Sequence, residues 1–332
     1  TVPFLGGYGD LSGGGLSFRN KLINGGFDIW QRGTSQTTDG YGSDDRWTNN
    51  NTGSTKVVSR QTFTNGQTDV AGNPKYWSRT VVTSVAGASN YVSKGQKIES
   101  VATFAGQTVT LSFWAKADAT KNLAVEFLQY FGAGGSPSSQ VSGIGVTTIT
   151  LSTSWQRFTV TTTIPSISGK TLGTDGNDAL QLVFWLDAGS SFNARTNSLG
   201  QQSGTFDIAN VQLEAGPQAT PFEPRPIGTE LALCQRYYKK YAYTAPFFTG
   251  RGNSTQLTFS LTIPEALSMR VPASLTFTDG RASSASVVDS VVTPGTATHS
   301  STNGYWTLAC GNSFGNVPVV AFLTNLELNA EL

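Results

Sequence analysis

Alternating apolar and polar residues recur in short runs along the first two thirds of the chain. In the stretch QTVTLSFWAKAD, Val109, Leu111, Phe113 and Ala115 take every second position, as in a strand with one buried face. Comparable runs, separated by turn-forming strings such as NGQTD and GTDGND, lie at residues 22–33, 54–63, 76–85, 90–99, 123–131, 147–164, 179–188 and 204–215. About eight or nine strands without a convincing helix predict an all-β fold, a jelly-roll β-sandwich over residues 20–223.

Trp114 departs from this alternation, because it places a large aromatic side chain on the face of its strand that the pattern predicts to be solvent-exposed. Three explanations are open. A loop or a second sheet buries this face, a groove offers the indole to a sugar, or another subunit covers it.

Two segments delimit the predicted sandwich. Residues 1–19 are rich in glycine and lack periodicity, which predicts a flexible arm or linker. Residues 215–228 (AGPQATPFEPRPIG) carry four prolines, which hold the preceding residues in extended conformations and predict a stiff connector. The chain is therefore expected to continue as a second domain over residues 224–332.

The second domain is predicted to open with a helix over residues 229–241 (TELALCQRYYKKY), with Thr229 as its N-cap. Apolar side chains on this helix would pack against the rest of the domain or form an oligomer interface; they are Leu231, Cys234, Tyr238 and Tyr241. Strand-like runs then resume, which predicts a smaller β-rich C-terminal domain; they lie at residues 255–263, 273–280, 285–292, 304–310 and 317–332.

Composition narrows the classes of function. The 332 residues carry a net charge of +1, and 13% of them are charged, so the chain lacks the excess of positive charge that binding to nucleic acid requires. No apolar stretch approaches the roughly 20 residues of a membrane span, and we expect no membrane insertion. The single histidine, His299, lies in a predicted loop and disfavours a catalytic triad or a transition-metal site. Cys234 and Cys310 are expected to be free thiols, with one disulfide as the alternative.

The acidic residues give little support for catalysis. A glycosidase needs two carboxylates that face each other about 5–10 Å apart. Most acidic residues here stand in turn-like strings such as GSDDRW and GTDGND, where aspartate caps turns. We therefore expect no enzyme and no required cofactor.

Several strings resemble known families. In order along the chain, LINGGFDIWQRG, TVTLSFWAKAD, SWQRFTVTTTIP, ALQLVFWLDAG and GTFDIANVQLEAGPQATPFEPRP resemble the carbohydrate-binding jelly rolls associated with xylanases and glucanases. NKLINGGFDIWQRG, DDRW, TPFEPRPIGTELALCQRYYKKY, IPEALSMRVPASLTFTDG and a terminal LNAEL resemble tail-fibre and related receptor-binding proteins of tailed bacteriophages. GTELALCQRYY is the most diagnostic block of the second set.

The second resemblance implies a virion protein of the tail fibre that is assembled in the host cytoplasm and contacts other tail proteins. It also implies non-covalent binding of a bacterial surface polysaccharide or lipopolysaccharide, and a homotrimer held in part by the helix at Leu231 to Tyr241. Two rival functions remain. One is a glycan depolymerase of the tailspike kind, and the other is a structural virion component, such as a fibre shaft or head decoration, without a ligand of its own.

Aromatic residues at strand ends and loops are the candidates for glycan contacts, because flat rings stack on the apolar face of a sugar. The candidates are Tyr76, Trp77, Tyr91, Tyr130, Phe131 and Trp185, and core or edge packing is the alternative for each. Trp30, Trp47 and Trp155 are assigned to the core.

The resemblance to carbohydrate-binding jelly rolls has two further implications. It implies a structural calcium with Asp28 and Asp207 as ligands, in strands that also carry Asn24 and Gly26. It also marks LSFWAKA as a framework string, so Trp114 is expected to pack in the fold or in an interface.

Overall fold

The computed structural model describes residues 18–241 and, beyond them, 246–251, 257–262, 274–276, 279–284, 287–291, 297–300, 305–310, 318–324 and 326–331. The predicted N-terminal arm lies outside the described residues except for Phe18 and Arg19. The chain divides into two compact units after Glu230, seven residues beyond the predicted end of the jelly roll at residue 223. Among the described residues, no helix is long and apolar enough to cross a membrane.

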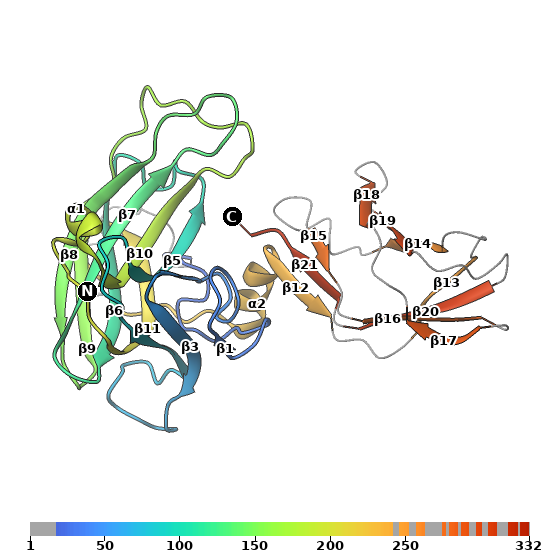
Figure 1. The fold of residues 1–332 in the computed structure, drawn as a ribbon. Helices are drawn as coiled ribbons and strands as arrows, with labels where there is room; N and C mark the ends of the chain where they lie inside the picture. The colour runs from blue at the N-terminus through green and yellow to red at the C-terminus, as the bar shows by residue number, and fades with distance from the viewer. Residues whose placement is uncertain are drawn as a thin grey trace, which may run out of the picture. The chain divides into compact units, whose positions relative to one another are not determined.

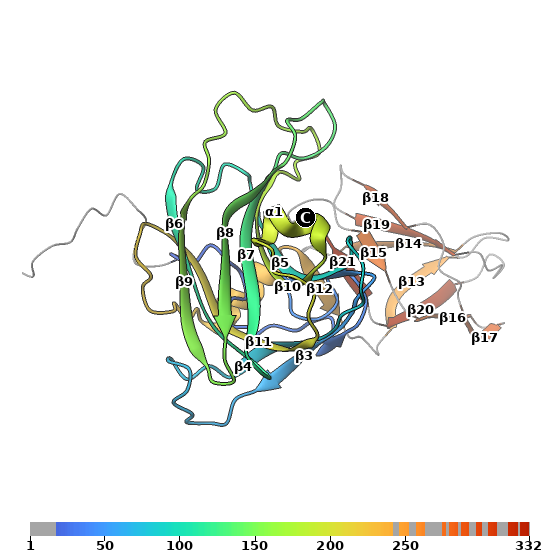
Figure 2. The same cartoon turned by 60° about the vertical axis from the view of Figure 1, so that its left-hand side comes forward.

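The first unit is a sandwich of two antiparallel β-sheets (Figures 1 and 2). The six-stranded sheet has the order β1 (Ser35–Gln36), β3 (Thr55–Thr62), β4 (Tyr76–Thr83), β11 (Gly204–Ala215), β6 (Thr108–Ala117), β9 (Gln156–Thr163). The five-stranded sheet has the order β2 (Thr48–Thr52), β5 (Tyr91–Glu99), β10 (Ala179–Ala188), β7 (Lys121–Tyr130), β8 (Val141–Leu151). The predicted jelly-roll sandwich is confirmed in architecture.

The core lies between the two sheets, where apolar side chains from both sheets form one cluster. On β6, Val109, Leu111 and Phe113 are fully buried, as their alternation predicts. Trp30 and Trp47 belong to the same core cluster, which confirms two of the three tryptophans assigned to the core.

Residues 22–33 are not a strand, contrary to the prediction. Asn24 and Phe27 take left-handed conformations, with φ of 56° and 58°. The Asn24 Nδ2 donates to the carbonyls of Ile29 (2.9 Å) and Asp45 (3.0 Å). These side-chain hydrogen bonds take the place of the backbone hydrogen bonds that a β-strand would make here. Gly25 is required here, because a Cβ at this position would stand 2.1 Å from the Val211 carbonyl oxygen.

The proline-rich segment, predicted as a stiff connector, is hydrogen-bonded to the sandwich. The Glu223 carboxylate accepts hydrogen bonds from the backbone N–H groups of Phe18 (2.7 Å) and Asn20 (3.1 Å). The Arg225 guanidinium donates to the carbonyls of Leu22 (3.1 Å) and Asn20. The prolines supply extended backbone, and these side chains then pin it in place.

The predicted helix is shorter and begins earlier than expected. It is α2 (Ile227–Gln235), so Thr229 lies inside it and is not its N-cap, and Tyr238 and Tyr241 lie in the strand β12 (Tyr238–Tyr241). Cys234 and Tyr238 are 0% and 2% exposed within the single chain. The four-residue stripe proposed as an oligomer interface therefore does not exist as one helical face.

The second unit is β-rich, as predicted. Its sheets have the orders β12-β21-β15, β13-β20-β16-β17 and β14-β19-β18. The strands are β13 (Pro246–Arg251), β14 (Leu257–Thr262), β15 (Ser274–Thr276), β16 (Asp279–Ser284), β17 (Val287–Val291), β18 (Ala297–Ser300), β19 (Tyr305–Cys310), β20 (Pro318–Thr324), β21 (Leu326–Asn329). His299 lies in β18, where it pairs with Trp306, and not in a loop.

Candidate functional site

The outer face of the six-stranded sheet carries a cluster of half-buried aromatic rings. Trp77 lies on β4, Phe63 directly follows β3 and Trp155 directly precedes β9. The ring centroids of Phe63 lie 4.4 Å from Trp77 and 5.4 Å from Trp155, and Trp77 meets Trp155 edge-to-face at 5.8 Å. Trp155 is thus on the outside of the sandwich, and its assignment to the core is wrong.

Two cationic side chains accompany these rings. The Lys116 Nζ lies 5.2 Å from the Trp155 ring centroid and 5.9 Å from that of Trp77, within the range of cation–π attraction. Arg79 binds both carboxylate oxygens of the buried Asp207 at 2.8 Å, and these hydrogen bonds raise the pKa of Arg79. Lys116 reaches the same carboxylate only at 3.9 Å.

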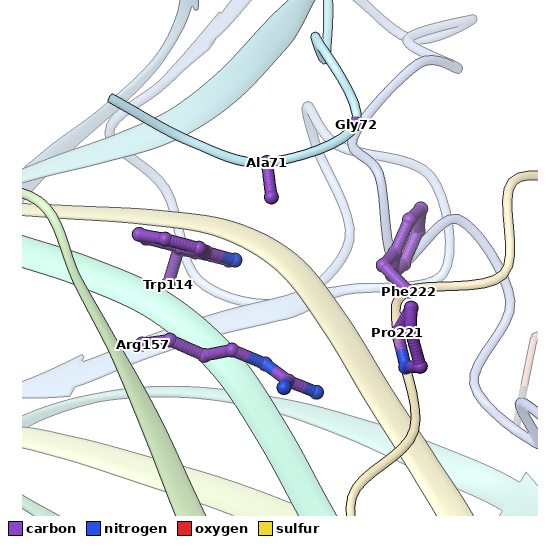
Figure 3. A pocket seen from close by; sticks show the side chains of 6 residues that line it. All are labelled: Ala71, Gly72, Trp114, Arg157, Pro221 and Phe222. Atoms are coloured by element: carbon purple, nitrogen blue, oxygen red, sulfur yellow. The ribbon is translucent and has the colours of Figure 1, made fainter. Parts of the chain in front are cut away.

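A pocket of about 310 Å³ lies on the same sheet face, with Trp114 and Arg157 on one side (Figure 3). Trp114 on β6 is half-buried and pairs in register with Arg157 on β9 and Ala209 on β11. The remaining lining is Ala71, Gly72, Pro221 and Phe222. In Figure 3 the Ala71 methyl points toward the indole, and Pro221 and Phe222 lie across from it. We call the outward set Phe63, Trp77, Trp114, Lys116, Trp155 and Arg157 the aromatic face.

Local structure holds the two outer walls of the pocket. β11 has an irregularity in its pairing with β6 between Ala209 and Gln212, and Asn210 there has φ of 48°. From this position its Nδ2 donates to the Ala71 carbonyl at 3.1 Å and fixes the loop that follows Phe63. On the other side, the Arg157 Nη2 donates to the Thr220 carbonyl at 2.5 Å, next to Pro221.

Of the predicted glycan contacts, only Trp77 belongs to the aromatic face. Tyr76 precedes it on β4 and therefore points to the opposite side of the sheet. Its ring lies under the Arg60 guanidinium at 4.5 Å and the Lys75 Nζ at 5.0 Å. The two neighbouring aromatics do not form one site.

Tyr91 and Trp185 lie together on the outer face of the five-stranded sheet, but a short insertion covers them. This cap consists of a 3-10 helix (Ser190–Phe192) and α1 (Asn193–Thr196), and Figure 2 shows α1 beside β7. The Phe192 ring lies 5.2 Å from Tyr91 and 5.0 Å from Trp185. Trp185 is 3% exposed, so its prediction as a glycan contact is wrong.

An ion pair between Arg195 and the buried Glu126 holds the cap in place. Glu126 on β7 is fully buried and accepts from the Trp185 Nε1 at 2.9 Å and from the Arg195 Nη2 at 2.5 Å. The Arg195 guanidinium also stacks on the Trp185 ring at 4.9 Å. Such a satisfied, charge-assisted network makes this face packing and not an open groove.

Tyr130 and Phe131 lie at the base of two long loops, seen at the top of Figure 1, that join β7 to β8 and β9 to β10. Tyr130 is half-buried, with the Lys97 Nζ at 5.4 Å from its ring. Phe131 is 1% exposed, and its carbonyl accepts from the Gly173 N–H at 2.7 Å. The prediction that both rings form an exposed loop tip is wrong for Phe131.

One of the two predicted calcium ligands, Asp207, is engaged by another side chain. Calcium requires six to eight oxygens, but the Asp207 carboxylate is occupied by the Arg79 guanidinium. In the described part of the chain, no group of three or more His, Cys, Asp or Glu side chains is placed to hold a metal ion. Asp28 stands beside Gly26, and burial of its carboxyl and the charge of Glu230 raise its pKa to about 6.

The sequence reasoning missed most of the aromatic face. One signal was available, since Trp114 breaks the alternation of its strand. Trp155 and Arg157 lie on either side of Gln156 in the string SWQRF. In a strand, residues two apart point to the same face, so both side chains lie on one face of the sheet. Alternation does not single out Phe63, at the end of the predicted run 54–63, or Phe222, which lies outside the strands.

No known family model matches the sequence, and no curated protein sequence matches it. Among solved structures, a CBM4 module is 19% identical, with 58% of this chain and 98% of that chain covered and a TM-score of 0.33. A family 11 carbohydrate-binding module from Clostridium thermocellum, in complex with a mixed-linked tetrasaccharide, is 13% identical, with 56% and 98% covered and a TM-score of 0.34.

A third similar structure is the enzymatically active domain of tailspike protein 4 of bacteriophage CBA120. It is 14% identical, with 60% of this chain but only 22% of that chain covered and a TM-score of 0.34. At such low identity and TM-score these likenesses support no conclusion about this chain. The sandwich architecture of the first unit rests on its own strand order.

Proposed function

We propose that the first unit binds a glycan non-covalently on its aromatic face. The observation that carries this proposal is the half-buried Trp114, which lines an apolar pocket on a sheet face that also bears Trp77 and Trp155. A pocket of about 310 Å³ falls within the usual range for small ligands. Half-exposed indoles bury C–H surface of a sugar ring at low entropic cost, because they have only two rotatable bonds.

The aromatic face is wide enough for more than one sugar unit. Trp77 on β4 and Trp114 on β6 are separated by the single strand β11. With strands about 4.8 Å apart, the two side chains arise roughly 10 Å from each other across the sheet. We therefore infer an oligosaccharide segment as the ligand, with one ring in the pocket and neighbouring units on the Trp77–Trp155 cluster.

Binding without cleavage is favoured over a depolymerase by the lining of the pocket. None of the described residues that line it is an aspartate or a glutamate, and cleavage of a glycosidic bond uses two facing carboxylates. Asp207, on the same sheet face, is held by Arg79 and is not placed as a free acid or base.

We further propose that this binding serves host adsorption by a tailed bacteriophage, as part of a tail fibre. The support for this context is the set of sequence blocks that resemble receptor-binding proteins, GTELALCQRYY above all. A homotrimer and contacts with other tail proteins belong to the same proposal. Because Cys234 and Tyr238 are buried within the chain, a three-fold contact would use other residues.

The test is glycan binding by matched variants. The full chain and its Trp114→Ala, Trp77→Ala and Tyr76→Ala variants are applied to an array of bacterial surface polysaccharides, and the best ligand is titrated by calorimetry. We expect each tryptophan variant to weaken binding by about 1–3 kcal/mol, by analogy with the loss of an aromatic side chain that stacks on a nucleobase.

Tyr76→Ala is the control, because it changes a neighbouring half-buried ring on the other side of β4. Melting temperatures identify any variant that fails to fold. Unchanged affinity in both folded tryptophan variants would refute the aromatic face as the site. Adsorption of phage to host cells, competed by the wild-type chain but not by Trp114→Ala, tests the biological context.

A further inference from the structure

We propose that the pocket selects an acidic sugar, whose carboxylate binds the Arg157 guanidinium while its ring packs on Trp114. This inference rests on the proposed function, since it names the chemical class of glycan that the same site takes. It follows from the placement of cations and acids around Trp114.

Arg157 is an exposed cation with hydrogen-bonding capacity left. It lines the pocket beside Trp114, and its Nη2 donates to the Thr220 carbonyl at 2.5 Å and the Ser112 Oγ at 3.3 Å. Within the described residues it makes no salt bridge to a carboxylate. The bonds to Thr220 and Ser112 hold the guanidinium in place, so little rotamer freedom is lost when its other N–H groups bind a ligand.

The acids near this site are already bound to other groups. Asp207 is held by Arg79. Glu214 accepts from the Thr220 N–H at 2.8 Å and from its hydroxyl at 2.7 Å. Lys116 lies two residues from Trp114 on the same face of β6 and approaches Asp207 only at 3.9 Å. The surroundings of the indole are therefore positive.

The rest of the lining supplies apolar surface and no side-chain amide or carboxylate. Ala71, Pro221 and Phe222 complete the pocket. Recognition of a neutral sugar by its hydroxyl groups calls for side chains that both donate and accept hydrogen bonds. A guanidinium only donates, and its planar fork matches a carboxylate. The lining thus fits a ring that carries one acidic group.

The experiment compares each acidic polysaccharide with its neutral derivative. Carboxylated bacterial polysaccharides are arrayed in native form and after chemical reduction of their carboxylates to primary alcohols. Wild type, Arg157→Gln and Arg60→Gln are applied in parallel. Arg60→Gln removes the same charge beside Tyr76, away from the pocket, and serves as the matched control.

We expect wild type to bind a native acidic polysaccharide and to lose about tenfold or more of its affinity when the carboxylates are reduced. Arg157→Gln should lose a similar factor on the native form and almost nothing on the reduced form, while Arg60→Gln follows wild type. Equal binding of native and reduced forms, or an unchanged Arg157→Gln, would overturn the inference.

The outcomes separate this inference from the function on which it rests. Binding that depends on Trp114 but is indifferent to carboxylates and to Arg157 overturns the acidic-sugar inference and leaves glycan binding standing. Absence of binding to every polysaccharide on the array, native or reduced, overturns both.

Discussion

A buried ion pair inside the sandwich gives the sharpest test of how this fold is held together. Lys94 on β5 and Asp44 form a salt bridge in which the two side chains are 1% and 0% exposed. Asp44 also accepts from the Ser43 Oγ (2.8 Å), the Asn49 Nδ2 (2.8 Å) and the Ser78 Oγ (2.9 Å). Burial lowers the pKa of Lys94, and the charge of Asp44 opposes that shift.

Lys94→Met removes the cation and keeps most of its aliphatic volume. Asp44 would remain buried with three neutral donors and no counter-charge. Breaking one side of such a pair costs about 3–5 kcal/mol. For a domain of 150–250 residues, each kcal/mol lowers Tm by about 2–4 °C, so we expect a fall of roughly 6–20 °C near pH 7.

The assay is thermal unfolding followed by circular dichroism near pH 7. The double variant Asp44→Asn, Lys94→Met should recover most of the lost stability, because it removes both charges of the pair and leaves neither without its partner. The exposed Lys75→Met serves as control and should stay close to wild type.

The reasoning would be refuted by a Lys94→Met variant that melts within about 2 °C of wild type, below the expected range. It would also be refuted by a double variant no more stable than the single one.

Three further predictions concern single positions. The pKa of Asp28 is raised to about 6 in the folded chain, so its contribution to stability is present below about pH 4 and is lost as pH rises through 6. The Asp28→Asn variant should therefore be more stable than wild type at pH 7, by no more than about 1 kcal/mol after solvent screening. Thermal melts between pH 4 and pH 7 test this, and the two proteins should be equally stable at pH 4. Phe131→Ala should cost about 3–5 kcal/mol in urea unfolding because its ring is fully buried, while Tyr130→Ala costs far less; equal losses would contradict the burial of Phe131. Gly25→Ala should lower the unfolding midpoint strongly, since its Cβ would stand 2.1 Å from the Val211 carbonyl oxygen, and a midpoint equal to wild type would show that this loop relaxes freely.

The strands of the sandwich could be predicted from the sequence because burial between two sheets imposes a period of two. The runs at 179–188 and 204–215 coincide with β10 and β11. Alternation does not identify segments in which side-chain hydrogen bonds replace the backbone ladder, as the Asn24 bonds do in residues 22–33. After Gln235 the string YYKKY fits both a helical stripe and an alternating strand, so the sequence does not decide between them.

The candidate site was harder to predict, because alternation tells which face a residue lies on and not what covers that face. Trp114 and Trp185 both point outward from their sheets. A four-residue helix with Arg195 closes over Trp185, whereas the segments at Ala71 and Pro221 leave a pocket beside Trp114. These covering segments are distant in sequence from the strands that they contact, and their composition does not predict where they lie.

The anchoring of the proline-rich segment has a mechanical consequence. We expect a pull on the chain beyond Glu230 to load the bonds of Arg225 and Glu223 before it reaches Phe222 in the pocket wall. Arg225 is tied to Glu230 at 3.1 Å and to the Leu22 carbonyl at 3.1 Å, and Glu223 to the N–H groups of Phe18 and Asn20. We expect these bonds to bear the tension before the wall deforms. They would then shield a ligand at the proposed site beside Trp114 from forces that arrive through the C-terminal part of the chain.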